Sequence, residues 1–327
     1  MTPLEQALRA RIRTEGSITV ESYMEACNSF YYATRDPLGA AGDFTTAPEI
    51  SQMFGEMIGA ALADCWHRAG RPSNTDYVEL GPGRGTLASD ALRVLRASGF
   101  GGRIHFVETS PMLRDCQRER HPDAEWHDSL LTLPEGRPLL IVANEFFDAL
   151  PVRQTVDGIE RRITIVGGSL TFDRDGTIVE HSPERVEVAT EIARQLDVRG
   201  GATLIIDYGH DTADATGETL QAVGGHKFAF VLDRPGEQDL TAHVDFAALA
   251  ESAQSVGIRV GNLVSQGNWL ETIGIGPRAM ALAAANPAKA EEIAAARRRL
   301  CDEEEMGRMF KVMGMAGGGW PLPAGVA

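Results

Sequence analysis

The stretch Asp76-Tyr-Val-Glu-Leu-Gly-Pro-Gly-Arg-Gly-Thr-Leu87 runs from a short apolar segment through three alternate glycines into a helical pattern. Gly81, Gly83 and Gly85 let the backbone turn sharply, and they let a ligand approach the chain without meeting a Cβ atom. A dinucleotide fingerprint has a third glycine where this chain has Thr86, and the Gly-Lys-Ser/Thr ending of a P-loop is absent. The loop therefore favours a nucleoside ligand over a phosphate cradle.

An acid at the end of the first predicted strand narrows the kind of ligand. Glu79 favours a cationic or hydroxyl-rich partner, and S-adenosyl-L-methionine offers a sulfonium, an ammonium and ribose hydroxyls. A glycine cluster after a strand also occurs as a simple tight turn, so the motif needs support from its surroundings.

That support comes from the next segments of the chain. Residues Leu87 to Leu95 have apolar positions at helical spacing, and Arg103 to Glu108 reads as a second strand ending in an acid. An acid at this point of a βαβ unit reaches the ribose hydroxyls of a bound nucleoside, so Glu108 is the predicted ribose ligand. The alternative is an acid that starts the helix after Ser110-Pro111.

Composition excludes several classes of protein. The chain has 327 residues, 43% of them hydrophobic, with a formal net charge of −15. No apolar run is long enough to span a membrane and no signal peptide is evident, which predicts a cytoplasmic protein. The acidic charge argues against nucleic acid and favours a basic protein or peptide partner. The four cysteines and eight histidines show no metal-ligand spacing, so no metal site is expected.

The chain divides into three predicted regions. Residues 1–70 form an N-terminal helical region with a Gly-Asp-Phe loop, and helices are expected to about Thr14 and over Val20 to Asn28. Residues 71–270 form the cofactor-binding core, with insertions at about 152–181 and 209–245. Residues 271–327 form a C-terminal helical region.

Alternating patterns within the core predict an α/β fold. The expected strands beside helical segments are Tyr77 to Leu80, Ile104 to Glu108, Ala124 to Trp126, Leu139 to Asn144 and Ala202 to Tyr208. Such alternation predicts a parallel sheet that binds its ligand beyond the carboxyl ends of its strands. The runs Arg161 to Val166 and Ser169 to Phe172, separated by two glycines, predict an inserted β-hairpin.

Two further acids follow the strand Leu139 to Asn144. Asn144, Glu145 and Asp148 would lie at the same edge of the sheet as the glycine loop, where they could orient a nucleophile and accept its proton. A pair of carboxylates would also hold a guanidinium by charge-assisted hydrogen bonds. The alternative is that Asn144 or Asp148 caps the turn that follows.

Other polar residues are weaker candidates. Asp128 could accept from an adenine amino group with Ser129 beside it, although an Asp-Ser pair is equally typical of a turn. His243 is a candidate general base, although a lone histidine is more often structural.

Five motifs together resemble one family. The Tyr31-Tyr32 pair, the Gly42-to-Gln52 run, Glu79 to Leu87, Asn144 to Pro151 and Asp239 to Phe246 are similar to the MidA-like class I S-adenosylmethionine methyltransferases over most of the chain. The resemblance implies a Rossmann-like methyltransferase sheet with an N-terminal helical region and an inserted substrate region. It also implies protein-arginine methylation, with symmetric dimethylation of a respiratory complex I subunit as in the family's mitochondrial members. It implies that a loop with Tyr32, Asp43, Phe44 and Thr46 closes over cofactor and acceptor.

Three functions stay open at this level. The leading one is a protein-arginine methyltransferase, and the same fold would also support methyl transfer to a small molecule or peptide. A third is an assembly factor that binds the cofactor without chemistry. A homodimer is compatible with the inserted hairpin, whose composition does not distinguish dimer contact from substrate docking.

Overall fold

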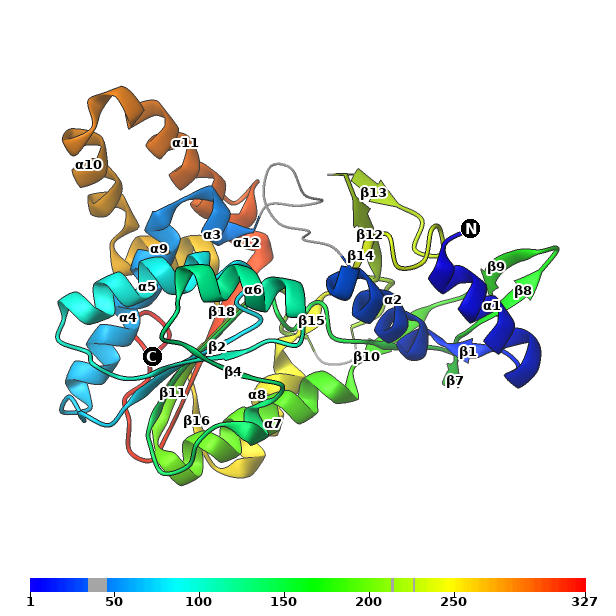
Figure 1. Ribbon diagram of the computed structural model, residues 1–327, viewed down its shortest axis with the longest axis horizontal. Coiled ribbons are helices and arrows are strands. Elements are labelled where there is room, and N and C mark those ends of the chain that lie inside the picture. The colour runs from blue at the N-terminus through cyan, green and yellow to red at the C-terminus, as the bar shows by residue number, and fades with distance from the viewer. Residues whose placement is uncertain (35–45, 213–214, 226) are drawn as a thin grey trace.

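A computed structural model describes residues 1–34, 46–212, 215–225 and 227–327. A long central sheet dominates the larger lobe (Figure 1). Its strand order is β16-β18-β11-β5-β2-β3-β4, with bounds Arg259–Val260, Phe310–Gly317, Gly201–His210, Leu139–Asn144, Asp76–Leu80, Ile104–Val107 and Glu125–His127. The five strands from β11 to β4 are mutually parallel, which confirms the predicted α/β fold and strand positions.

The sheet is mixed, not purely parallel as the alternation suggested. β18 runs antiparallel to β11 over its full length, from Gly201↔Gly317 to Tyr208↔Phe310, and β16 pairs antiparallel to β18. β18 is almost wholly buried and apolar, as expected for a strand covered on both faces. A short apolar run of this kind cannot be distinguished from a helical segment by periodicity, so the strand within 271–327 was not foreseen.

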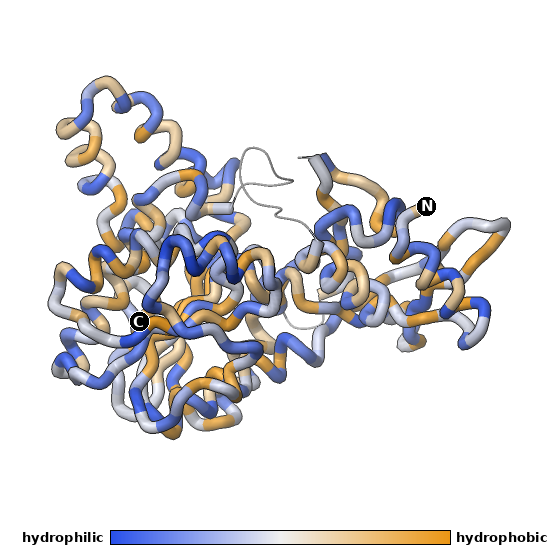
Figure 2. Tube along the Cα trace, in the orientation of Figure 1, coloured by the Kyte–Doolittle hydropathy of each residue, from blue (hydrophilic) through white to orange (hydrophobic). Residues whose placement is uncertain are grey.

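Helices cover both faces of the central sheet, and the apolar residues concentrate between the layers (Figure 2). One face packs against α4 (Gln52–Arg68), α5 (Thr86–Ala97), α9 (Gln266–Ile273) and α10 (Ile275–Ala285). The other packs against α7 (Pro183–Arg199) and α8 (Phe246–Val256). The strands β2, β3 and β5 are buried on both sides, so their carboxyl ends are the parts left free for a ligand.

A smaller lobe is built from three separate parts of the sequence (Figure 1). Its core joins α1 (Pro3–Glu15) and α2 (Val20–Thr34) to the inserted strands and to residues 220–242. The predicted hairpin is present as β8 (Arg162–Val166) and β9 (Ser169–Phe172). The other strands here are β1 (Ile18–Thr19), β6 (Arg153–Val156), β7 (Ile159–Glu160), β10 (Ile178–His181), β12 (Gln221–Gly224), β13 (Lys227–Ala229) and β14 (Asp239–Thr241).

One helix boundary differs from the sequence expectation. Helix α2 continues to Thr34, past the end expected at Asn28. The side chain of Thr46 makes no capping hydrogen bond at the start of α3 (Ala47–Ile50). Ser51 instead caps α4 by accepting from the Met53 backbone N–H at 3.2 Å.

The remaining elements connect these layers. Asn286-Pro287 separates α10 from α11 (Ala290–Cys301), and these two helices project from the larger lobe (Figure 1). The shorter elements are α6 (Pro111–Arg120), α12 (Met306–Met309), β15 (Val244–Asp245), β17 (Val264–Ser265), η1 (Leu130–Thr132) and η2 (Pro287–Lys289). None of the helices in the described ranges has the length and apolar character of a membrane span.

Candidate active site

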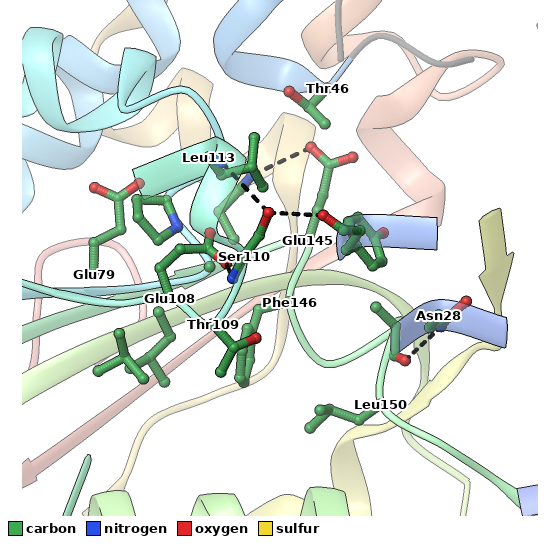
Figure 3. Close-up of a pocket in the computed structure, with 18 of the residues that line it drawn as sticks. Asn28, Thr46, Glu79, Glu108, Thr109, Ser110, Leu113, Glu145, Phe146 and Leu150 are labelled. Carbon is green, nitrogen blue, oxygen red and sulfur yellow. Dashed lines mark hydrogen bonds between the residues drawn. The ribbon is translucent and has the colours of Figure 1, made fainter. Parts of the chain in front are cut away.

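A cavity of about 770 Å³ opens at the carboxyl ends of β2, β3 and β5, between the two lobes (Figure 3). Its volume lies within the range of roughly 300–1,000 Å³ that is typical of small-molecule sites. The predicted residues on its wall are Tyr32, Thr46, Glu79, Gly81, Gly83, Glu108, Asp128, Ser129, Asn144 and Glu145. The topology therefore brings most of the predicted site together.

The glycine loop forms the floor beside β2. Gly81, Gly83 and Gly85 have φ angles of 58°, 54° and 75°, a left-handed conformation that favours glycine. A Cβ on Gly81 would lie 2.9 Å from Phe146 Cδ2. Gly85 does not line the cavity, and a Cβ there would meet the His121 ring at 2.9 Å. Gly85 therefore serves close packing behind the loop.

Glu79 at the end of β2 is buried and points toward the cavity (Figure 3). Tyr77 donates its hydroxyl proton to Glu79 Oε2 at 2.6 Å. Burial raises the pKa of Glu79 to about 8, although the Tyr77 hydrogen bond opposes the rise. A cationic ligand in the cavity would favour the carboxylate form.

Glu108 follows β3 and is buried at the neighbouring strand end. Its Oε1 accepts from the Ser110 backbone N–H at 2.8 Å, and its Oε2 lies 3.3 Å from the Gln117 amide donor. Burial raises the pKa of Glu108, and these donors oppose that rise. The carboxylate is thus held at the cavity wall while it also supports the turn into α6, so both predicted roles are compatible.

Asp128 and Ser129 follow β4 on the same wall. Asp128 is exposed and its Oδ1 lies 2.6 Å from Arg114 Nη2. Arg114 also donates through Nε to the Glu108 backbone carbonyl at 2.7 Å. Arg114 therefore joins the segments that follow β3 and β4.

Asn144 and Glu145 end β5 at the centre of the cavity. Glu145 has φ 49°, a left-handed conformation that costs a non-glycine residue about 1–3 kcal/mol. Its Oε1 accepts from the Ala47 backbone N–H at 3.0 Å and from the Asn144 side-chain amide at 3.2 Å. Burial, together with the nearby Asp148 and Asp239, raises the pKa of Glu145 to about 8. No basic side chain among the described residues forms an ion pair with it.

Asp148 lies behind the cavity wall and not on it. It is buried beside Asp207, whose Oδ2 accepts from the backbone N–H groups of Phe147 and Asp148 at 3.0 and 3.2 Å. Burial raises the pKa of both carboxyl groups. The turn after Glu145 points the Asp148 side chain away from the cavity, so its predicted contact with an acceptor is not seen in this geometry.

A buried arginine holds this turn in place. Arg185 of α7 donates to the backbone carbonyls of Asp148, Leu150, Ala242 and His243 at 2.9, 3.1, 3.1 and 2.6 Å. A guanidinium can satisfy several carbonyls at once because its donors form a rigid planar fork. The segment after Glu145 is thereby anchored to the segment before β15.

His243 also lies away from the cavity. Its ring packs edge-on against Tyr208 with centroids 5.5 Å apart, and burial lowers its pKa. In this geometry the predicted general base makes a packing contact and does not face the cavity. Asp245, which follows His243 in the chain, caps α8 by accepting from the Ala248 backbone N–H at 3.1 Å.

Two of the four predicted loop residues are described, while Asp43 and Phe44 lie outside the described residues. Tyr32 donates its hydroxyl proton to Asp239 Oδ1 at 2.7 Å, and its backbone carbonyl accepts from the Ser110 hydroxyl at 2.7 Å. Thr46 stands at the cavity edge near Glu145 (Figure 3). Helix α2 thus reaches the edge of the sheet where the carboxyl ends of the strands meet the cavity.

Several residues of the site were not predicted. Asn28 donates to the Ala149 and Leu240 carbonyls at 2.8 and 2.7 Å and lines the cavity from the smaller lobe (Figure 3). Glu49 Oε1 accepts from the Thr86 hydroxyl at 2.6 Å beside the glycine loop. No sequence pattern indicated that Asn28 lines the cavity. Asp207 could have been noticed, because an acid within the apolar strand β11 is unusual.

The cavity suits the predicted cofactor. Asn144 Oδ1 is buried without a hydrogen-bond partner among the described residues, so it can accept from an ammonium. Glu108 at the second strand end can hold ribose hydroxyls, and the Gly81 backbone admits a close approach. The sheet order, the glycine turn and these acids together define a class I S-adenosyl-L-methionine-dependent methyltransferase.

Comparisons with known proteins agree with this class. Residues 57–167 and 158–264 match the family described as "Putative S-adenosyl-L-methionine-dependent methyltransferase". A Drosophila melanogaster relative, "Protein arginine methyltransferase NDUFAF7 homolog, mitochondrial", is 35% identical over 95% of this chain and 84% of its own length. The human relative, "Protein arginine methyltransferase NDUFAF7, mitochondrial", is 32% identical over 85% of this chain and 75% of its own length. The chain belongs to this methyltransferase family, which confirms the resemblance read from its motifs.

A solved structure supports the cofactor. A Burkholderia thailandensis protein crystallised with S-adenosyl-homocysteine has a TM-score of 0.85 and is 26% identical, over 99% of this chain and 92% of that one. This protein is thus an S-adenosyl-L-methionine-dependent methyltransferase. When bound, that cofactor supplies an electrophilic methyl group for in-line transfer.

The expectation of a cytoplasmic protein is wrong by the same comparisons. The Drosophila and human relatives are named as mitochondrial proteins. The expectation rested on an absence of targeting and membrane signals, and an absence of that kind does not determine a compartment.

Proposed function

We propose that this enzyme methylates an arginine side chain of a protein. The observation that carries the proposal is the acidic cavity wall. Among the described residues, its ionisable side chains are seven acids and one base: Glu25, Glu49, Glu79, Glu108, Asp128, Glu145, Glu184 and Arg84. Such a wall attracts a cation by its electrostatic potential and disfavours an anionic acceptor.

Glu145 is the proposed contact for the guanidinium. It lies at the end of β5, and its carboxyl group has no described cationic partner. A guanidinium in the cavity would favour the ionised carboxylate and could bind it by two parallel N–H···O hydrogen bonds. Asn144 and the Ala47 N–H restrict the carboxylate to one orientation, which positions the acceptor nitrogen.

Glu145 also suits the release of a proton. Transfer of a methyl group to a guanidinium nitrogen releases one proton from that nitrogen. The bound guanidinium would keep this carboxyl group ionised, and a carboxylate whose pKa is raised by burial is a stronger base than an ordinary glutamate. We propose that Asp148 acts on Glu145 through its charge and not by contact with the acceptor, because Asp148 lies behind the cavity wall.

The expectations about the acceptor, the partner and the product are part of the same proposal. The names of the relatives support arginine as the acceptor and a protein as the substrate. Symmetric dimethylation, a respiratory complex I subunit as partner, a homodimer and the absence of nucleic acid binding stay predictions from sequence. The division of the chain near residues 70 and 270 is likewise carried forward as a proposal.

The test is transfer of a labelled methyl group to proteins of an extract from cells that lack this gene. The labelled band is digested to amino acids, and methylarginine is identified by mass spectrometry. We expect methylarginine with wild type and none with Glu145→Gln, while the exposed variant Glu187→Gln behaves as wild type. Label on another residue type or only on small molecules would contradict an arginine acceptor.

A further inference from the structure

Two histidines and one glutamate lie close together at the β3–β4 edge of the sheet, outside the set of residues that line the cavity. Strands β3 and β4 pair in parallel with His105 opposite Glu125 and Val107 opposite His127. Alternate residues of a strand share a face, so Glu125 and His127 lie on the same side. One ligand atom from each of His105, Glu125 and His127 lies within 4.8 Å of the others.

The distances match those between ligands of a single ion. His105 Nδ1 lies 3.0 Å from His127 Nε2 and 3.8 Å from Glu125 Oε2. Two atoms bound tetrahedrally to one Zn²⁺, at about 2.0–2.1 Å each, stand roughly 3.3 Å apart. Small side-chain movements would therefore bring the three atoms to one ion.

The outer nitrogens of both rings face hydrogen-bond acceptors. His105 Nε2 lies 3.4 Å from the buried carboxylate oxygen Asp76 Oδ2. His127 Nδ1 lies 3.4 Å from Thr132 Oγ1, whose own proton is donated to the Ser129 carbonyl at 2.9 Å. Both outer nitrogens are therefore the favoured positions of the ring protons.

It follows that the two inner nitrogens face each other with lone pairs. At 3.0 Å this arrangement needs either a shared proton or a metal ion between the rings. Asp76 behind His105 resembles the carboxylate that commonly orients a metal-binding histidine from its far side. Asp76 is itself held by Arg103 and Arg137 at 2.9 and 2.8 Å, so its position is well determined.

We propose that His105, Glu125 and His127 form a site for a divalent transition metal, with Zn²⁺ as the best match. Two imidazole nitrogens and one carboxylate oxygen suit Zn²⁺, and a fourth position stays open because the Glu125 side chain is 48% exposed. The proposed site departs from the sequence expectation of no metal, which rested on spacing along the chain. These ligands are 20 and 2 residues apart and meet only through strand pairing.

The position of the site suggests what the ion does. β4 is a three-residue edge strand, and His127 directly precedes Asp128 and Ser129 on the cavity wall. A metal that joins β3 to β4 would hold this edge strand against the sheet. The ion would thus act structurally beside the cofactor cavity, independently of the acceptor substrate.

The test is zinc binding by the full-length protein after removal of metal with a chelator. Titration with ZnCl₂ against a chromogenic chelator should show one ion per chain, and Co²⁺ should give the visible absorption of a tetrahedral site. His127→Ala should weaken binding at least about tenfold, and Glu125→Gln should weaken it less. His181→Ala, an exposed histidine on β10, is the matched control and should bind as wild type.

Two outcomes would overturn the proposal. One is the absence of saturable zinc uptake by wild type, which would leave a shared proton as the bridge between the rings. The other is equal zinc affinity in His127→Ala and His181→Ala. Circular dichroism checks that each variant folds, and the exposed Glu125→Gln supplies the comparison if His127→Ala does not. Zinc should also raise the thermal midpoint of wild type more than that of Glu125→Gln.

Discussion

Glu145 Oε1 accepts a hydrogen bond from the Ala47 backbone N–H at 3.0 Å, across 98 positions of sequence. The bond joins the first residue of α3 to the end of β5. The carboxylate at the centre of the cavity is therefore held by the segment that follows the predicted loop. Any movement of that segment would change the orientation of Glu145.

Replacement of Glu145 tests its place in the reaction. Glu145→Gln keeps the shape of the side chain but removes its ability to bind a cation as a carboxylate and to accept a proton. We expect kcat/KM for methyl transfer to fall about 10²–10⁴-fold, with cofactor affinity changed less than about threefold. Isothermal titration with S-adenosyl-L-methionine and a radiolabel assay separate the two effects. Wild-type activity in Glu145→Gln would remove this residue from the mechanism, and Glu187→Gln is the control.

Replacement of Glu108 tests the ribose contact. Glu108→Gln removes the charge from a buried hydrogen-bond acceptor, and hydrogen bonds to charged groups contribute about 1.5–3 kcal/mol. The dissociation constant of S-adenosyl-L-methionine should rise roughly 10- to 150-fold by calorimetry. Glu119→Gln on the exposed face of α6 should bind the cofactor as wild type. Equal cofactor affinities in the two variants would mean that Glu108 stabilises the turn into α6 and does not contact the ribose.

Substitution of two glycines that have the same φ angle distinguishes the cost of backbone strain from the cost of a steric contact. Gly81 and Gly167 both have φ 58°, but a Cβ on Gly81 would meet Phe146 at 2.9 Å whereas one on Gly167 meets nothing within 4 Å. Gly167→Ala should lower the free energy of unfolding by about 1 kcal/mol through strain. Gly81→Ala should lower it further and weaken cofactor binding. Urea unfolding and calorimetry measure both, and equal losses in the two variants would contradict the Phe146 contact.

The two buried carboxyl groups of the cavity predict a pH dependence of stability. The pKa values of Glu79 and Glu145 are raised from 4.5 to about 8 in the folded protein. The folded state therefore binds more protons, and this stabilisation is fully present below about pH 4.5 and lost as pH rises through 8.

Urea unfolding of the cofactor-free protein at pH 6 and pH 9 measures that loss. We expect these two groups together to lower the free energy of unfolding by roughly 5 kcal/mol between the two pH values. The double variant Glu79→Gln, Glu145→Gln should lose less. A loss as large in the double variant as in wild type would assign the pH dependence to other groups.

The part of the fold predicted best is the unit from β2 to β3. Its turn depends on Gly81, Gly83 and Gly85, and the helix after it follows from apolar spacing within a dozen residues. Glu79 and Glu108 were placed correctly at the cavity because strand ends of a parallel sheet share one edge.

Prediction failed where side-chain direction depends on distant contacts. Asp148 was expected in the cavity, but the positive φ of Glu145 and the backbone contacts of Asp207 and Arg185 direct it behind the wall. The contact from Arg185 is not encoded in any local sequence pattern. Strand β18 was missed because a buried apolar run has no distinctive period.

The sequence by itself determined the class of fold, the glycine turn and the acids at the strand ends, because these depend on the conformational preferences of neighbouring residues. Only the tertiary structure decided which side chains share a space. Ala47 meets Glu145, and His105 meets His127, through strand pairing and packing between residues far apart in the chain. Such contacts are selected by the burial of whole surfaces, and no single stretch of sequence specifies them.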